Sequence, residues 1–389
     1  MKKIIFCLQT MILGGVEKEL IAVLKKIHVD FDITLLLLYP GDLEIIKDIP
    51  NDVHVKIMNI DKSYYCSSLV ELAKQRVKRG KLFEAINIVA KRCLKIGMPA
   101  SNININDLPI LDDTFDIAVC YHIHSPLMLK YTAQKIKAEK KIAWIHNDFY
   151  TTKYPIQRLK KFVVEYDEFV AVSKKVENEF RALCLWYQGR ISTAYNYLDS
   201  KEIIELSNEH LQDEMFTKGT NIKILTIGRF VEQKGIDIAI ETCAMLKEKK
   251  LKFRWFVIGY GELENTYRKL IKENEIEDCF IILGRKMNPY PYIKNCDIYV
   301  QPSRHEAYPL VLMEAKIFRK PIVCTDFDGA DEQIDNGTNG IIVPIEDTKK
   351  LCEEISNLII SSKDRVALSK KLEEWHAEDD RAEIVKHFK

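Results

Sequence analysis

Two glutamates eight positions apart stand on either side of a proline in the segment SRHEAYPLVLMEA. The segment follows an apolar run that predicts a strand, and the proline suits the first turn of a helix because its ring presets the helical φ. Glu306 is then expected on the loop that enters the helix, and Glu314 inside the helix. The free N–H groups of Leu310 and Val311 would point outward beside Glu306. A helix start that binds anions next to a carboxylate suits a phosphorylated sugar.

Strands and helices must alternate to hold such a site. Twelve short apolar runs are separated by helical patterns, and runs that are apolar throughout are typical of parallel strands covered on both faces. We therefore predict an α/β protein with two parallel sheets. The runs are 3–9, 32–39, 54–60, 116–123, 141–146, 168–173, 222–228, 253–259, 280–284, 297–303, 321–325 and 340–344.

A change in composition marks the division between the sheets. The segment 197–220 is more polar than its surroundings, and we place the hinge there. We expect Rossmann-like domains over 1–198 and 199–372, and a C-terminal helix over 373–389 that packs back toward the first domain. Because strand C-termini and helix N-termini of both domains would face one crevice, the site is expected to draw on both halves.

Composition excludes several classes of protein. The 389 residues are too many for one ordinary core, and 58 basic against 57 acidic side chains disfavour a protein that binds nucleic acid over its whole surface. The ten cysteines form no C-x-x-C pair and most lie in apolar runs, so they are expected to be reduced core residues. We find no apolar run long enough to cross a bilayer and no cleavage site after the apolar start, so we expect a cytoplasmic protein.

Several further motifs carry a family resemblance. These motifs and the paired glutamates occur in the same order as in the retaining glycosyltransferases of family 4, which the chain therefore resembles. That family has the GT-B fold of two Rossmann-like domains facing each other across a cleft. The resemblance is dense over 221–345 and looser before. The matching segments are MILGGVEKEL, WIHND, VAVSKK, YNYLD, GRFVEQKG, VIGYGELE, LGRKMNPYPYIKNCDIYV and DGADEQIDNGTNGIIVP.

The resemblance implies a role for each matching residue on the donor side. Arg229 and Lys234 would hold the diphosphate, which a guanidinium and an ammonium can neutralise without a metal. Glu314 would bind the ribose hydroxyls, and Glu306 would lie near the transferred sugar as a base, a stabiliser of positive charge or an anchor. The nucleobase region is expected at Gly259, Gly284, Arg285 and Tyr290, and the helix start at Leu310 and Val311 would add N–H groups to the diphosphate.

The first half of the chain contributes fewer candidates. His146 follows an apolar run, and the resemblance implies that it reaches the donor sugar and phosphate from the first domain. Gly15 lies between a strand and a helix, where a missing side chain lets the backbone approach a phosphate, although a plain turn is an equal alternative. His122 and His124 end another run, and nothing raises them above ordinary structural histidines.

Two departures and one rival motif qualify the resemblance. Ala307 and Ala330 stand where the family usually has glycine, so the contacts to the donor sugar are expected to differ. Asp326 and Asp328 form a D-x-D triplet of the kind that holds a metal in glycosyltransferases of the other main fold. With Arg229 and Lys234 present, we expect no metal and no cofactor.

A basic segment, 72–96, has apolar residues at rough helical spacing. It is a candidate for lying on an anionic membrane, where lipid-linked acceptors are displayed, and an ordinary solvated helix is the alternative.

The resemblance implies a hexosyltransferase that moves a sugar with retention from a nucleotide sugar, expected to be a UDP-sugar, to a hydroxyl of a glycan or lipid-linked acceptor in bacterial surface polysaccharide synthesis. The enzyme would be cytoplasmic or peripheral on the inner face of the membrane, with no nucleic-acid partner. A nucleotide-sugar 2-epimerase of the same fold and a non-catalytic, membrane-associated partner that keeps the nucleotide site are the alternatives.

Overall fold

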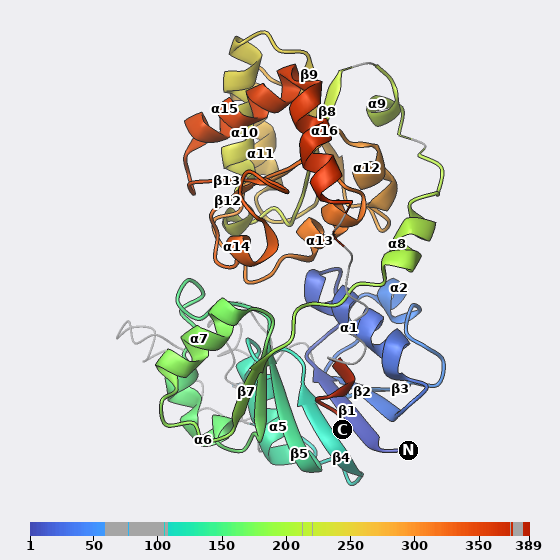
Figure 1. The fold of residues 1–389 in the computed structure, drawn as a ribbon. Coiled ribbons are helices and arrows are strands. Elements are labelled where there is room, and N and C mark those ends of the chain that lie inside the picture. The colour runs from blue at the N-terminus through green and yellow to red at the C-terminus, as the bar shows by residue number, and fades with distance from the viewer. Residues whose placement is uncertain are drawn as a thin grey trace.

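The protein was examined as a computed structural model. It has two α/β domains, one above the other, each built on one sheet (Figure 1). The described residues are 1–58, 77, 105, 108–211, 213–219, 221–373, 375 and 384–389.

The first sheet has seven parallel strands in the order β3-β2-β1-β4-β5-β6-β7. Its central strands are apolar and buried on both faces, as the uninterrupted apolar runs predict. The strands are β1 (Lys3–Leu8), β2 (Asp32–Leu37), β3 (His54–Ile57), β4 (Thr114–Cys120), β5 (Lys137–Ile145), β6 (Glu168–Ala171) and β7 (Arg190–Thr193).

The second sheet has six parallel strands in the order β10-β9-β8-β11-β12-β13. In both sheets the order of the strands reverses beside the first strand of the sheet, which is the doubly wound arrangement predicted from the sequence. The strands are β8 (Ile222–Ile227), β9 (Phe253–Ile258), β10 (Phe280–Gly284), β11 (Ile298–Gln301), β12 (Ile322–Thr325) and β13 (Ile341–Val343).

Twelve of these strands overlap the predicted runs, and β7 does not. Its sequence, RIST, has one large apolar residue, and none of its four residues is buried because it lies at the edge of the sheet. A polar edge strand carries no apolar signal, so the pattern could not reveal it.

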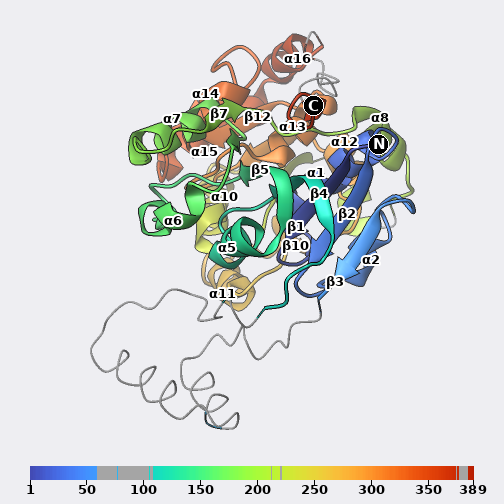
Figure 2. The same cartoon turned by 90° about the horizontal axis from the view of Figure 1, so that it is seen from below.

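Helices cover both faces of each sheet (Figures 1 and 2). No helix among the described residues is long and apolar enough to span a bilayer. The helices are α1 (Gly15–Ile27), α2 (Leu43–Ile46), α5 (Pro126–Lys135), η3 (Ile156–Leu159), α6 (Lys160–Val163), α7 (Lys174–Leu183), α8 (Ser200–Leu206), α9 (Glu214–Thr217), η4 (Glu232–Lys234), α10 (Ile236–Glu248), α11 (Glu264–Glu273), α12 (Tyr290–Asn295), α13 (Leu310–Ile317), α14 (Ala330–Gln333), α15 (Thr348–Ile360) and α16 (Ser362–Lys371).

Two glycines allow the loops above the second sheet to pack closely. A Cβ on Gly259 would lie 1.9 Å from the carbonyl oxygen of Gly228, and a Cβ on Gly235 would lie 1.9 Å from that of Pro302. Gly235 also has φ 62°, a left-handed conformation that favours glycine. The loops after β8, β9 and β11 are thereby held together at the edge of the cleft.

The end of the chain returns to the first domain. The Phe388 ring lies 5.6 Å from that of Phe6 and 6.2 Å from that of Trp144, between ring centroids. His387 Nδ1 lies 2.8 Å from Glu168 Oε1, and Lys140 Nζ donates to the His387 carbonyl oxygen. Residues 384–389 are thus packed on the first sheet, on the opposite side of the hinge from α16.

Candidate functional site

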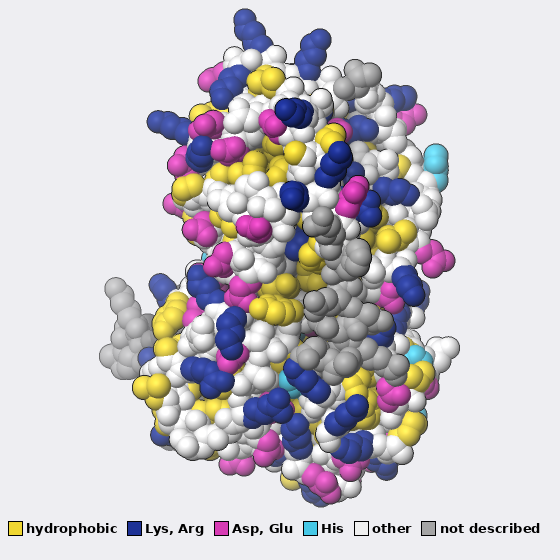
Figure 3. Space-filling view, viewed as in Figure 1, with side chains coloured by type: hydrophobic (Ala, Val, Ile, Leu, Met, Phe, Trp, Pro, Cys, Tyr) yellow, Lys and Arg dark blue, Asp and Glu magenta, His cyan; other side chains and the backbone are white. Residues whose placement is uncertain are grey.

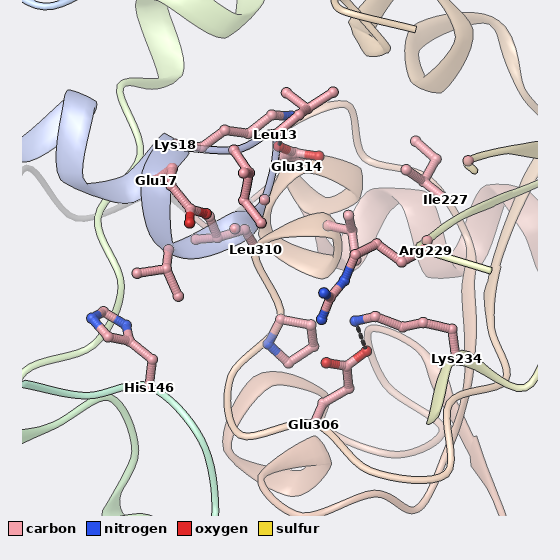
Figure 4. Close-up of a pocket in the computed structure, with 18 of the residues that line it drawn as sticks. Leu13, Glu17, Lys18, His146, Ile227, Arg229, Lys234, Glu306, Leu310 and Glu314 are labelled. Carbon is pink, nitrogen blue, oxygen red and sulfur yellow. Dashed lines mark hydrogen bonds and ion pairs between the residues drawn. The ribbon is translucent and has the colours of Figure 1, made fainter. Parts of the chain in front are cut away.

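A cavity of about 320 Å³ lies between the two domains. Its walls are the start of α1 and the residues after β4 and β5 in the first domain, and the loops after β8, β9, β10 and β11 in the second. Ten of the twelve site residues predicted from sequence line it: Gly15, His146, Arg229, Lys234, Gly259, Arg285, Glu306, Leu310, Val311 and Glu314 (Figure 4).

Glu306 and Lys234 form an ion pair in the floor of the cavity. Lys234 Nζ donates to Glu306 Oε1 at 2.5 Å, and the same oxygen accepts a 2.8 Å hydrogen bond from Ser303 Oγ (Figure 4). Glu306 is buried and Lys234 only slightly exposed. The ion pair fixes both side chains from loops that are 72 residues apart in sequence.

The Arg229 guanidinium points into the cavity toward this ion pair (Figure 4). The residue is exposed, and its guanidinium makes no hydrogen bond or ion pair with any described residue. The first turn of α13 lies beside it with no side-chain cap, because the residue before the helix is Pro309. Pro309 precedes the helix instead of lying in its first turn as the sequence suggested. An unpaired cation and uncapped N–H groups on one wall form an anion site.

Glu314 lies deeper in the second domain and is 1% exposed. Its Oε1 lies 3.5 Å from Lys18 Nζ of the first domain, and its Oε2 has no hydrogen-bond partner among the described residues. Tyr290 stands behind this pair, with Lys18 Nζ 5.3 Å from its ring centroid. Burial, with Glu314 nearby, raises the pKa of the Tyr290 phenol well above its usual value. Tyr290 therefore supports the cavity without lining it.

Only part of the predicted nucleobase region lines the cavity. Gly259 and Arg285 line the cavity, whereas Gly284, at the end of β10 with φ 70°, does not. Arg285 forms an ion pair with Asp42 of the first domain and lies 5.4 Å from the Tyr260 ring. The Arg285 guanidinium lowers the pKa of Asp42. This ion pair bridges the two domains at one corner of the cleft.

Histidines form the opposite wall. His146 is buried, with Nδ1 3.5 Å from Glu19 Oε2 and Nε2 lacking a hydrogen-bond partner among the described residues. Burial, with His122 nearby, holds the pKa of His146 well below its usual value, and burial lowers that of His122 to about 4. His122 lines the cavity and accepts a 3.1 Å hydrogen bond from Asn147, whereas His124 does not line it. Both cavity histidines are therefore neutral near pH 7.

Two buried carboxyl groups of α1 were not singled out from the sequence. Glu17 lines the cavity, and burial raises its pKa to about 7, while its own backbone N–H and Arg229 act in the opposite direction. Burial raises the pKa of Glu19 to about 8, and the nearby Tyr121 hydroxyl acts in the opposite direction. Their position directly after Gly14 and Gly15 in the quoted motif was the available signal.

Other polar side chains complete the lining; they lie in the quoted motifs but were not singled out from the sequence. Asn196 lies just before the hinge and donates a 2.8 Å hydrogen bond to the Tyr308 carbonyl oxygen, while its own Oδ1 is buried without a partner among the described residues. The remaining polar lining residues are Lys18, Asn147, Gln233, Tyr260 and Lys286.

The D-x-D triplet lies away from the cavity. Neither Asp326 nor Asp328 lines it, and Asp328 forms an ion pair with Lys175 of the first domain. Of the two alanines that replace family glycines, Ala307 lines the cavity and Ala330 begins α14. A Cβ on Gly329 would lie 2.5 Å from the Ala307 carbonyl oxygen, so these two loops are in close contact.

Comparison with known proteins finds similarity to one family over the second domain. Residues 207–375 match the family described as glycosyl transferases group 1. Over 138 residues the chain is 33% identical to the amylovoran biosynthesis glycosyltransferase AmsK of Erwinia amylovora, covering 33% of this chain and 34% of the relative. Over 180 residues it is 31% identical to a Campylobacter jejuni enzyme named N,N'-diacetylbacillosaminyl-diphospho-undecaprenol alpha-1,3-N-acetylgalactosaminyltransferase, covering 44% and 46%. The matches thus span between a third and a half of these relatives.

A solved structure resembles the whole chain. Anabaena HepE in complex with UDP-glucose superposes with a TM-score of 0.71 at 15% sequence identity, covering all of this chain and 99% of HepE. At this identity the likeness establishes the fold. The second domain thus matches the glycosyl transferases group 1 family over residues 207–375, and the whole chain has the two-domain GT-B fold.

Proposed function

We propose that the protein is a retaining glycosyltransferase that moves a sugar from a UDP-sugar to a hydroxyl of a glycan or lipid-linked acceptor in bacterial surface polysaccharide synthesis. One observation carries the proposal. The unpaired Arg229 guanidinium, the Lys234–Glu306 ion pair and the uncapped start of α13 converge on one cavity, which His146 faces from the other domain.

The second-domain wall would bind the donor. Arg229, Lys234 and the N–H groups of Leu310 and Val311 would hold the diphosphate, and Glu314, whose Oε2 is unpartnered among the described residues, would accept from the ribose hydroxyls. Gly259, the backbone near Gly284 and Arg285 would surround the base, with Tyr290 supporting Glu314 from behind. Gly15 would bring the backbone of the first domain close to the phosphates. No metal is required in this arrangement.

In the reaction, the bond between the anomeric carbon and the diphosphate oxygen breaks, and its electron pair leaves with UDP. The acceptor oxygen forms the new bond on the same face of the sugar, and its proton passes to an oxygen of the departing diphosphate. The fixed cations and helix N–H groups stabilise the charge that develops on the departing diphosphate. Glu306, held by Lys234 and Ser303, would lie beside the sugar, and neutral His146 would bind it from the opposite side.

The names of the similar proteins support the choice of substrates. The HepE structure holds UDP-glucose, and the Campylobacter enzyme is named for a lipid-diphosphate acceptor. A lipid-linked acceptor would place the protein on the inner face of the membrane. The basic segment 72–96 lies outside the described residues, so its contact with membrane stays a prediction.

The decisive experiment is a transfer assay with a panel of nucleotide sugars. We expect transfer from a UDP-sugar, with a product of retained anomeric configuration. Arg229→Ala should lower kcat/KM by about 100-fold or more, a size typical of losing one charge-stabilising donor. Arg268→Ala is the matched control, because Arg268 is an exposed arginine of the same domain that pairs only with Glu264 on its own helix.

Three outcomes would reject the proposal. Near-normal turnover of Arg229→Ala would reject the diphosphate site. Conversion of UDP-GlcNAc to an epimer without acceptor would identify a 2-epimerase, and binding of nucleotide sugars with no turnover of any would leave a non-catalytic partner.

A further inference from the structure

A surface of the first domain, away from the cleft, carries cations with no acidic partners. Three segments meet there, 126–137, 150–164 and 181–190, which contain three, four and two Lys or Arg residues and no Asp or Glu. They comprise α5, η3 and α6, and the turn between α7 and β7. Because α6 and this turn precede β6 and β7, they lie at the amino ends of the strands, opposite the cleft (Figures 1 and 2).

Aromatic side chains bring these cations together. Lys160 Nζ lies 4.9 Å from the ring of Trp186, and Lys161 Nζ lies 4.8 Å from the ring of Phe162. Lys130 Nζ of α5 lies 5.6 Å from the same Phe162 ring. Burial and the neighbouring charge of Lys161 lower the pKa of Lys130. Like charges from two of the three segments are therefore crowded here, beside Trp186 of the third segment.

These cations are not neutralised within the protein. Lys130, Lys160, Lys161 and Arg158 form no ion pair with any described residue, in contrast to Arg181 and Arg190, which pair with Glu177 and Glu168. The nearest exposed acids along the chain are Glu165 and Asp167, and their charges interact with Lys141, where they act to raise its pKa against the effect of burial. Figure 3 shows Lys and Arg side chains on the face of this domain that is turned toward the viewer.

Apolar side chains are exposed beside the cations. Leu185 is 83% exposed and Val164 is 51% exposed, and Leu185 is next in the chain to Trp186, whose ring the Lys160 ammonium contacts. Hydrogen bonds join segment 181–190 to segment 150–164 and the residues just after it. Tyr187 Oη donates a 3.0 Å hydrogen bond to the Tyr166 carbonyl oxygen, and Gln157 Nε2 donates one to the Leu183 carbonyl oxygen. The surface formed is called the basic-aromatic surface and comprises Lys130, Arg158, Lys160, Lys161, Val164, Leu185 and Trp186.

We infer that the basic-aromatic surface binds the anionic surface of a phospholipid membrane. Unpaired lysines attract acidic headgroups, and an exposed leucine with a tryptophan can enter the headgroup boundary while the lysine ammonium groups stay in water. A nucleic acid would use the cations but not the protruding Leu185 and Val164. Binding through this end of the domain would leave the cleft open to the solvent. The inference does not depend on which sugar the enzyme transfers.

The test is sedimentation of the full chain with vesicles of phosphatidylcholine alone or with 30% phosphatidylglycerol. We expect binding only to the anionic vesicles, with weaker binding as salt rises. Since each lysine near an anionic surface contributes roughly fivefold, Lys160→Glu with Lys161→Glu should lower the partition coefficient on the order of 25-fold or more. Leu185→Asn with Trp186→Ala should lower it without changing the salt dependence.

The matched control is Lys252→Glu with Lys272→Glu, the same charge change at exposed positions of the second domain, which should bind vesicles almost as the unchanged chain does. UDP affinity and melting temperature of all variants should stay near those of the unchanged chain, which separates this inference from the proposed reaction. Equal binding to both vesicle types, or a charge-reversed surface that binds as well as the control, would overturn the inference. So would binding to an acidic protein or RNA with none to vesicles.

Discussion

The second domain presents a guanidinium, an ammonium and free helix N–H groups to the cleft, whereas the first domain presents, apart from Lys18, buried side chains that favour their neutral forms. Arg229 is unpaired among the described residues, and Lys234 shares its charge with Glu306 alone among the described acids. Across the cleft, His122 and His146 have lowered pKa values and Glu17 a raised one, each mainly through burial.

The difference separates two tasks. Fixed positive charge is suited to a diphosphate, whose charge is present before the reaction and grows during it. Neutral hydrogen-bonding groups are suited to sugar and acceptor hydroxyls, and they add no charge that would compete with the leaving group. Three substitutions test this difference between the two walls and the contact between the domains.

The largest effect is expected on the charged wall. Lys234→Met removes a cation from the diphosphate site and leaves Glu306 buried without its ion partner, so kcat/KM should fall by about 1000-fold in the transfer assay. Lys272→Met, at an exposed position of the same domain, controls for loss of a lysine. A loss of less than tenfold for Lys234→Met would show that the ion pair is structural and that the diphosphate lies elsewhere.

A change on the neutral wall should alter stability with pH. Glu17 has a pKa of about 7 in the folded chain against an ordinary value of 4.5, so the folded state binds more protons between these values. The folded chain is therefore most stable, as far as Glu17 is concerned, below pH 4.5, and this stability is lost as pH rises through 7. Glu17→Gln should remove this loss. The difference in free energy of unfolding between the variant and the unchanged chain should therefore shift in favour of the variant by up to about 3 kcal/mol between pH 5 and pH 8.

Denaturant unfolding of both chains from pH 5 to 8 measures this difference. Glu262→Gln, at an exposed position of the second domain, controls for the substitution itself. If Glu17→Gln and the unchanged chain lose stability in parallel across this range, Glu17 is not the buried proton-binding group that the structure indicates.

The smallest effect is expected where the domains touch outside the cavity. Glu332 of α14 accepts hydrogen bonds from the backbone N–H groups of Lys174 and Lys175 at the start of α7, at 2.8 and 2.9 Å, and from Tyr195 Oη at 3.1 Å. Glu332→Ala should weaken this contact and raise the donor KM about two- to fivefold. Glu353→Ala, on the outer helix α15, is the control, and equal KM values for both variants would show that the contact does not aid closure.

Much of the architecture was readable from the sequence, because buried parallel strands are apolar along their whole length and twelve of them gave that signal. The donor wall was readable because its residues sit in motifs of fixed spacing around glycines such as Gly235 and Gly259, whose neighbours leave no room for a Cβ. The polar edge strand β7 was missed because it has no apolar run.

Contacts between the two domains could not be predicted from the sequence. Glu332 belongs to a quoted motif, yet its partners lie 157 and 158 residues away in the chain, and no local pattern reports such a bond. The same holds for the pairing of Lys18 with Glu314 and for Tyr290, which the resemblance placed at the nucleobase and the structure places beside Lys18, outside the cavity lining.

The most direct test of the division between the walls is the affinity for UDP, measured by isothermal titration calorimetry on Arg229→Ala and His146→Ala. The account predicts that Arg229→Ala raises the Kd by about 50-fold or more, whereas His146→Ala raises it by less than about fivefold while turnover falls. A His146→Ala chain that loses UDP as completely as Arg229→Ala, or an Arg229→Ala chain that binds UDP normally, would contradict it.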